Sequence, residues 1–400
     1  MTQQNLETER RKRLSTAQRV VIKLGTSTVT GEGGKVSTER IEPLARSIVA
    51  LKKAGRQIVL VSSGAVGLGA GRLGLHPSRL KDVVIRQACA AVGQSLLMHA
   101  YEKLFHLHEV NIAQVLLTED DFTDFRRYTN LRRTMEKLLK LGVLPIINEN
   151  DTVSTAELES ELEYDQTESG HERVFGDNDR LAALVMSKLE ADALILLTNV
   201  DGLLNHQAKP RGDDQTDVPG QPLSLVEEIT DDLKAIARGP SAGGRGGMLT
   251  KLEAAQIAMQ AGGVCVIANG KTPEVLDRVL AGEQMGTTFM PRSRMAGKRR
   301  WITYAAGVRG RVIVNEGARE AIIKGKGSLL ASGVVRIEQQ FAPQDVVSIA
   351  DADGREFARG IISCASDEAA RLIEGTAPHQ LGERGRVLVT RDNLVLSEQR

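Results

Sequence analysis

The stretch from Arg19 to Thr28 reads Arg-Val-Val-Ile-Lys-Leu-Gly-Thr-Ser-Thr, an apolar run that stops at a glycine followed by three hydroxyl residues. A continuous Val/Ile run of this length is typical of a strand covered on both faces. Burial of the charge on Lys23 inside this strand is unfavourable unless an anion meets it. We therefore predict that Lys23 binds an anion. The alternative is an edge strand from which the lysine reaches solvent.

A second lysine ends the glycine-rich stretch Gly-Gly-Arg-Gly-Gly-Met-Leu-Thr-Lys, residues 243–251, and apolar residues beyond it mark one face of a helix. Lys251 would lie in the first turn of that helix, where the helix dipole disfavours a cation and favours an anion. Glycines let backbone amides approach a polyphosphate, and a helix start supplies unpaired donors. The stretch therefore predicts a phosphate site, with a flexible interdomain turn as the alternative.

Length and composition set the outer limits. The 400 residues suffice for two or three domains, and the 52 basic and 51 acidic residues nearly cancel, which indicates no polyanionic partner. Cys89, Cys265 and Cys364 have no paired spacing, which argues against a zinc site or disulfide framework and favours a cytoplasmic location. No apolar run approaches a membrane span. Residues 1–18 have no signal-peptide core; we interpret them as a mobile tail, or else a short docking helix.

Strand and helix patterns alternate along most of the chain, which predicts an α/β fold with a mainly parallel sheet. Each strand ends in a polar or glycine-containing turn, and the carboxyl ends of parallel strands meet at one edge, where ligands bind. The expected strands are 19–24, 57–61, 111–117, 143–147, 193–197 and 264–268. The expected helices are 37–54, 77–108, 120–141, one that opens within 175–180 and runs to about 189, and 274–280. A G-x-G-x-x-G at Gly69, Gly71 and Gly74 starts well past its strand, which disfavours a dinucleotide site.

Two further stretches stand out by charge. Residues 157–172 hold seven acidic and no Lys or Arg residues, which is typical of a solvated, mobile loop. Residues 286–300 hold five basic and no acidic residues and are interpreted as a linker. We expect a tail over 1–18, an α/β domain over 19–285, and a small β-rich domain with one helix around 318–323 over 301–400.

Two lysines, glycine loops and clustered carboxylates favour phosphoryl transfer, although the P-loop motif is missing because Val36 follows Gly34-Lys35. No His or Cys has a catalytic setting. A carboxylate acceptor is already ionised at neutral pH, so it needs no general base, and positioning with charge neutralisation could supply the catalysis.

Five motifs, in order, closely resemble those of the glutamate 5-kinases in the amino acid kinase family. They are Val-Ile-Lys-Leu-Gly-Thr-Ser (21–27), Val-Ser-Ser-Gly-Ala-Val (61–66), Ile-Asn-Glu-Asn-Asp (147–151), Gly-Asp-Asn-Asp (176–179) and Gly-Gly-Met-Leu-Thr-Lys (246–251). The resemblance covers nearly all of residues 19–400, and the part after Trp301 resembles a PUA domain. It implies a three-layer sandwich, the amino acid kinase fold, and ATP-dependent phosphorylation of the glutamate side-chain carboxylate, the first step of proline biosynthesis.

The resemblance also implies residue roles. Lys23 and Lys251 would neutralise the transferring phosphoryl group, and Asp179 would orient both. Ser63, Gly64, Asn148, Asp151 and Asn178 match positions that bind or lie near glutamate. The positions matching the nucleotide site are Lys23, Thr198, Asn199, Arg245, Gly246, Gly247, Met248, Leu249, Thr250 and Lys251. The family further implies magnesium bound with ATP, homo-oligomers (dimers or tetramers), feedback inhibition by proline and contact with glutamyl phosphate reductase. We expect no metal site made by protein side chains.

Three departures from the family pattern bear on function. Asn199 stands where aspartate is usual, which bears on how the nucleotide is held. Arg245 replaces a small or hydroxyl residue and is expected to add a phosphate contact. The acidic stretch 157–172 is longer than usual, and we hypothesise that it gates the substrate or alters proline sensitivity.

Other functions remain open at this point. A PUA module suits an RNA-binding or RNA-modifying protein, yet residues 301–400 hold 13 basic and 13 acidic residues, so the net positive charge of a nucleic-acid binder is missing. Thr390 also stands where the related kinases usually have histidine. A sibling kinase acting on aspartate, acetylglutamate, carbamate or UMP is the other alternative, but the PUA-like tail and the Gly-Asp-Asn-Asp turn favour glutamate.

Overall fold

The computed structural model describes residues 3–118, 120–153, 178–204, 222–237, 247–291, 294–305, 307–325, 327–374 and 387–397. The chain divides into two compact units. The first comprises Met1–Asp121 and Arg126–Arg294, and the second comprises Phe122–Phe125 and Met295–Arg400.

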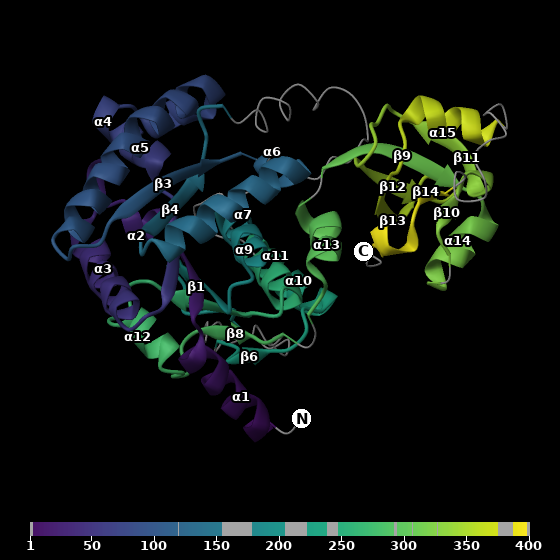
Figure 1. Ribbon diagram of the computed structural model, residues 1–400. Coiled ribbons are helices and arrows are strands. Elements are labelled where there is room, and N and C mark those ends of the chain that lie inside the picture. The colour runs from purple at the N-terminus through teal and green to yellow at the C-terminus, as the bar shows by residue number, and fades with distance from the viewer. Residues whose placement is uncertain are drawn as a thin grey trace, which may run out of the picture. The chain divides into compact units, whose positions relative to one another are not determined.

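The first unit is built on an eight-stranded sheet with the order β3-β4-β2-β1-β5-β7-β8-β6 (Figure 1). Its neighbouring strands run parallel except for the pair β7 and β8. The strands are β1 (Arg19–Leu24), β2 (Gln57–Ser62), β3 (Ile112–Leu117), β4 (Leu144–Glu149), β5 (Ala193–Thr198), β6 (Leu225–Val226), β7 (Val264–Asn269) and β8 (Thr287–Phe289). The prediction of a mainly parallel sheet is confirmed.

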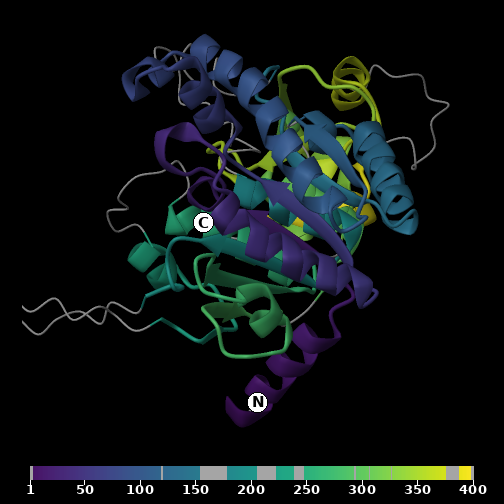
Figure 2. The ribbon, with the colours of Figure 1, turned by 90° about the vertical axis from the view of Figure 1, so that its left-hand side faces the viewer.

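Helices cover both faces of this sheet, which makes three layers (Figures 1 and 2). The main ones are α3 (Thr38–Lys53), α4 (Ala65–Leu73), α5 (Val83–His106), α7 (Phe125–Lys140), α9 (Asn178–Leu189), α11 (Met248–Gln260) and α12 (Val275–Leu280). Alternate residues of β1 serve the two faces. Ile22 joins the apolar cluster that contains Ile48 of α3 and Val279 of α12, whereas Lys23 contacts Asp179 of α9. Successive side chains of a strand point to opposite faces, so this division is expected.

Strand β1 lies in the middle of the sheet, between β2 and β5. Lys23 is in register with Val61 of β2 and Leu196 of β5, and it is buried. The alternative of an edge strand with a solvent-reaching lysine is therefore wrong. Because β1, β2, β4 and β5 are parallel, their polar carboxyl ends lie at one edge of the sheet, as predicted.

Three expectations about elements need correction. The expected mobile tail forms α1 (Gln3–Thr16), and the buried guanidinium of Arg10 donates hydrogen bonds to the main-chain oxygens of Gly282 and Glu283, so the docking helix is the better description. The expected linker contains β8, because its three residues pair with β7. The expected helix over 77–108 consists of a short 3-10 turn (Pro77–Lys81) and α5.

The second unit has a five-stranded sheet with the order β11-β9-β12-β13-β15, beside a pair β10 and β14. These strands are β9 (Val308–Val314), β10 (Leu329–Leu330), β11 (Val334–Glu338), β12 (Val346–Ala350), β13 (Glu356–Ile361), β14 (Val387–Val389) and β15 (Leu394–Leu396), with helices α14 (Glu316–Ile323) and α15 (Ser366–Ile373). The unit includes Phe122 and Phe125, which contact Trp301: its indole N–H donates to the Phe122 oxygen at 2.8 Å, and its ring meets Phe125 edge-on.

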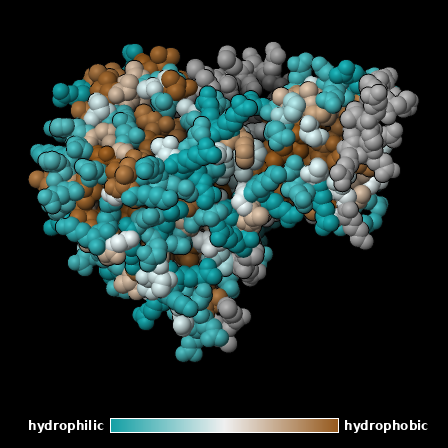
Figure 3. All heavy atoms as spheres, viewed as in Figure 1, coloured by the Kyte–Doolittle hydropathy of each residue, from teal (hydrophilic) through white to brown (hydrophobic). Residues whose placement is uncertain are grey.

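The surface is mixed in character. On the face that Figure 3 shows, hydrophilic side chains predominate and hydrophobic ones are scattered among them. Within the described parts of the chain, every helix is too short or too polar to cross a membrane.

Candidate active site

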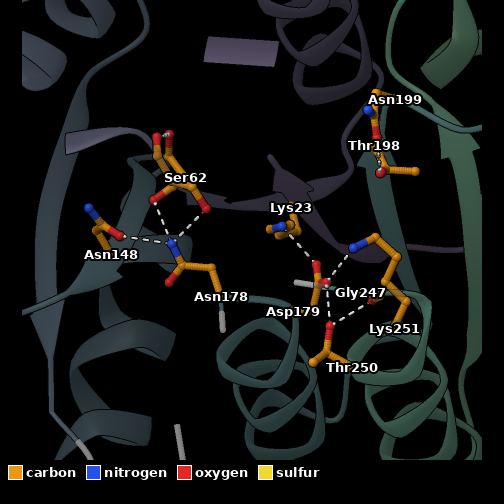
Figure 4. Close-up of polar contacts among 11 residues, drawn as sticks. Lys23, Ser62, Asn148, Asn178, Asp179, Thr198, Asn199, Gly247, Thr250 and Lys251 are labelled. Carbon is orange, nitrogen blue, oxygen red and sulfur yellow. Dashed lines mark hydrogen bonds and ion pairs between the residues drawn. The ribbon is translucent and has the colours of Figure 1, made fainter. Parts of the chain in front are cut away.

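Lys23 and Lys251, 228 positions apart in the sequence, meet on one carboxylate (Figure 4). The ammonium nitrogen of Lys23 lies 2.8 Å from Asp179 Oδ1, and that of Lys251 lies 2.9 Å from Asp179 Oδ2. All three side chains are buried, and Asp179 is fully so. The cluster combines two positive charges with one negative charge, so it retains a net positive charge that suits an anionic ligand.

Two helix starts and one strand hold these groups. Asp179 lies in the first turn of α9, where the dipole favours a carboxylate, and Lys251 lies in the first turn of α11, as predicted. Burial alone would raise the pKa of Asp179, but the charges of Lys23 and Lys251 and their hydrogen bonds lower it from 3.8 to about 2. Asp179 is therefore ionised at neutral pH and fixes both ammonium groups in place.

Residue Asn178 precedes Asp179 and points to a second polar cluster (Figure 4). Its amide nitrogen donates to the Ser63 hydroxyl at 2.7 Å, to Asn148 Oδ1 at 3.1 Å and to the Ser62 main-chain oxygen at 3.3 Å. These partners stand at or just beyond the carboxyl ends of β2 and β4. Consecutive residues of α9 thus join a cluster of amides and hydroxyls to the charged cluster.

The turn after β2 depends on a glycine. Gly64 has φ +107°, a conformation that side-chain-bearing residues rarely adopt, and a Cβ there would come within 3.0 Å of Thr30 Oγ1. The Gly64 oxygen accepts from the Leu68 amide, which starts α4. Asp151 lies two residues beyond β4 and is half-buried in the following turn.

The residues expected to bind nucleotide flank the charged cluster. Thr198 ends β5, and its hydroxyl donates to Asn199 Oδ1 at 3.3 Å. The Thr250 hydroxyl lies 2.9 Å from the Gly247 oxygen and 3.4 Å from Asp179 Oδ2. Gly247, Met248 and Leu249 lead into this turn of α11. Arg245, Gly246 and the acidic stretch 157–172 lie outside the described residues.

Sequence reasoning missed two residues of α5 that support the amide cluster. Gln94 Oε1 accepts from Asn148 Nδ2 at 2.9 Å. The buried Tyr101 hydroxyl lies 2.8 Å from the Ser62 hydroxyl, and burial raises the pKa of Tyr101. The seven-residue spacing of Gln94 and Tyr101 places both on one helix face, which is a signal, but no motif marks either residue.

Two glycines of the formal G-x-G-x-x-G have a packing role. Gly69 and Gly71 lie within α4. A Cβ on Gly69 would overlap the Cys89 oxygen of α5 at 1.8 Å, and one on Gly71 would overlap the Gly33 oxygen at 2.6 Å. These two glycines permit close approach of neighbouring backbones.

A comparison of the sequence with protein families agrees with the fold and with the paired lysines at the sheet edge. The chain belongs to the amino acid kinase family, whose model matches residues 18–269. The PUA domain model matches residues 310–378. The predicted fold class, an amino acid kinase domain followed by a β-rich PUA domain, is confirmed.

Three similar proteins are named glutamate 5-kinase. The protein of Caldanaerobacter subterraneus subsp. tengcongensis is 42% identical over 388 residues, covering 95% of this chain and 98% of that protein. The protein of Moorella thermoacetica is 44% identical over 400 residues, covering 98% and 99%. The protein of Myxococcus xanthus is 44% identical over 361 residues, covering 90% of each. The resemblance read from the five motifs is confirmed.

Proposed function

We propose that the chain transfers the γ-phosphoryl group of ATP to the side-chain carboxylate of L-glutamate, giving glutamyl 5-phosphate, the first step of proline biosynthesis. The observation that carries this proposal is the placement of Lys23 and Lys251 on the two oxygens of Asp179. The near full-length similarity to glutamate 5-kinases supports the choice of substrate.

The reaction needs positioning and charge neutralisation more than proton transfer. A carboxylate oxygen of glutamate attacks the γ-phosphorus, the bond from phosphorus to the β–γ bridging oxygen breaks, and ADP leaves with that electron pair. Lys23 and Lys251 would neutralise the oxygens of the moving phosphoryl group, and Asp179 would hold both ammonium groups. The carboxylate nucleophile is already ionised at neutral pH, so the reaction needs no general base.

The nucleotide is proposed to lie along the ends of β5 and α11. The amides at the start of α11 would meet its phosphates, and Thr198 and Asn199 would contact it nearby. No group of three or more acidic, His or Cys side chains in the described residues could hold a metal ion. Because the family resemblance implies magnesium bound with ATP, we place magnesium on the phosphates, where it would offset the charge of their oxygens.

Glutamate is proposed to occupy the amide and hydroxyl cluster. Ser63, Asn148 and Asn178 join in hydrogen bonds at the end of β2 and β4, and Gly64 and Asp151 belong to the adjoining turns. Asn178 is bonded to this cluster while the next residue, Asp179, holds the lysines. The acceptor carboxylate would thereby face the phosphoryl group.

Purified protein incubated with ATP, magnesium and single amino acids tests the substrate. L-Glutamate should stimulate ADP release, and hydroxylamine should trap a hydroxamate, the expected product of an acyl phosphate. Aspartate, acetylglutamate, carbamate and UMP serve as the sibling acceptors. Turnover with one of these and none with L-glutamate would overturn the proposal.

Regulation and assembly are proposed from the same family membership. We infer homo-oligomers, inhibition by proline at or near the glutamate position, and delivery of the labile product to glutamyl phosphate reductase. A cytoplasmic location remains a prediction. The hypothesis that residues 157–172 gate the substrate is tested by shortening them; unchanged glutamate KM and proline inhibition would contradict it.

A further inference from the structure

The hydrogen-bond chain through Gln94, Asn148 and Asn178 has a fixed direction. The amide of Glu149, which can only donate, bonds to Asn148 Oδ1 at 2.9 Å. Asn148 therefore turns its Nδ2 group to Gln94, whose oxygen accepts at 2.9 Å. At the other end, the main-chain oxygen of Ser62, which can only accept, meets Asn178 Nδ2. Main-chain groups thus decide which end of each asparagine amide donates, and Gln94 supplies the acceptor that holds the Nδ2 end of Asn148.

This direction determines what the cluster can offer to a ligand. Asn178 Nδ2 already faces three acceptors, those of Ser62, Ser63 and Asn148. Among the described residues, Asn178 Oδ1 is buried without a hydrogen-bond partner. A buried acceptor of this kind is unfavourable unless a donor reaches it. The Ser63 oxygen accepts from Asn178, which leaves the hydroxyl proton available for donation.

We propose that Gln94 is a positioning residue that fixes the amides of Asn148 and Asn178 so that Asn178 Oδ1 accepts from the α-ammonium of an amino-acid substrate. The Ser63 hydroxyl, with the opposite polarity, donates to its α-carboxylate. The inference rests on the proposed function for the class of substrate. Gln94 lies outside the substrate cluster. The proposal assigns the α-ammonium group of the substrate to Asn178 and its α-carboxylate to Ser63.

Three variants test the role of Gln94. Gln94→Met removes the acceptor while keeping the length, and it should raise the KM for L-glutamate about tenfold or more, with smaller changes in kcat and in the KM for ATP. Gln94→Glu keeps an acceptor and should stay within about threefold of the wild type. Gln57→Met is the matched control, because the half-buried Gln57 also accepts one side-chain bond, from Arg19 at 2.8 Å, but at the amino end of β2.

A substrate analogue separates positioning from general loosening. Glutarate keeps both carboxylates of glutamate but has no ammonium group. Wild-type protein should prefer L-glutamate to glutarate strongly in kcat/KM, since a site built around a hydrogen bond rejects a ligand that lacks the donor. Gln94→Met should reduce this preference at least about tenfold, and Gln57→Met should leave it unchanged.

The outcomes distinguish the two proposals. An unchanged preference in Gln94→Met, or a Gln94→Glu variant as impaired as Gln94→Met, would overturn the role of Gln94 while leaving the kinase activity intact. Wild-type protein that fails to phosphorylate L-glutamate would overturn the proposed function itself. Melting temperatures identify a variant that fails to fold; if Gln94→Met does, the Gln94→Glu preference decides the question.

Discussion

At the scale of single residues, Asp179 determines the electrostatics of the site. Its carboxylate is fully buried, and the adjacent ammonium groups of Lys23 and Lys251 keep its pKa at about 2 despite the opposing effect of burial. A pKa that is lowered in the folded state contributes stability that is fully present above the unfolded value of 3.8 and is lost as pH falls toward 2.

Replacement of this carboxylate should affect both stability and turnover. Asp179→Asn leaves two buried ammonium groups without a counter-charge, so we expect a loss of about 3 to 5 kcal/mol in unfolding free energy at neutral pH. Turnover should fall because the lysines lose their common anchor. Urea denaturation between pH 3 and pH 7 measures the first effect. The advantage of the wild type over the variant should begin to shrink as pH falls below 3.8.

The exposed Asp232 of helix α10 (Asp231–Ala237) gives the control, and Asp232→Asn should behave as the wild type does. An Asp179→Asn protein as stable as the wild type at neutral pH would contradict the account of a buried, charge-paired carboxylate.

Much of the charged cluster was predictable at this scale, but its supports were not. Lys23 within an apolar strand and Lys251 at a helix start both required an anion. The five sequence motifs, in their order along the chain, indicated which residues accompany these two lysines. Gln94 and Tyr101 lie in a helix without a motif, and their roles depend on which strand ends pack beside α5. Such pairings arise only when the tertiary structure brings the side chains together.

At the scale of elements, α7 and α9 pack with a lysine between them. Lys188, near the end of α9, is buried, and its nitrogen lies 3.1 Å from the centre of the Tyr128 ring of α7. Burial, followed by the charge of Arg132, lowers the pKa of Lys188 from 10.5 to about 7. The amine can donate an N–H to the ring face in either protonation state.

Lys188→Met should therefore stabilise the protein near neutral pH. The unfolded state binds more protons than the folded state between pH 7 and pH 10.5, so the wild type gains stability as pH rises through this interval. We expect the variant to exceed the wild type by on the order of 2 kcal/mol at pH 7, with the difference shrinking toward pH 10. Thermal or urea denaturation across this range measures it.

Lys137→Met, on the exposed side of α7, is the control and should leave the pH dependence unchanged. A Lys188→Met variant that is less stable than the wild type at pH 7 would mean that the ammonium group contributes favourably in this position.

Elements were predictable where the pattern is local. Strands β1, β2, β5 and β7 were predictable from long apolar runs, because a strand that is buried on both faces has a continuous apolar sequence. Strand β8 has only three residues in a basic stretch, and its pairing with β7 is decided by contacts between distant segments. Helix α1 has no apolar stripe, and it docks through Leu14 and the bonds of Arg10 to main-chain oxygens.

At the scale of the whole molecule, the chain combines a kinase unit with a PUA domain of balanced charge. The 13 basic and 13 acidic residues of 301–400 give no net attraction for phosphate backbones. The full chain should therefore retain tRNA on a filter only weakly at about 50 mM salt and lose it by about 200 mM. An established tRNA-binding protein provides the positive control. Tight retention at the higher salt would favour an RNA-binding role for the second unit.

The division of the chain was only partly predictable at this scale. The change of pattern near Trp301 indicated a second domain, and the PUA match over 310–378 agrees with it. The inclusion of Phe122–Phe125 in that unit was not predictable, because it depends on contacts with Trp301 across 176 positions of the chain.

The measurement closest to the central claim is the turnover number of ATP-dependent glutamate phosphorylation in Lys23→Ala and Lys251→Ala, with Lys53→Ala on the exposed side of α3 as control. If both ammonium groups neutralise the transferring phosphoryl group, each variant should lose roughly a hundredfold or more in kcat, about 3 kcal/mol of transition-state stabilisation. The control should match the wild type. Near-full turnover in either site variant, with the fold intact, would contradict the account.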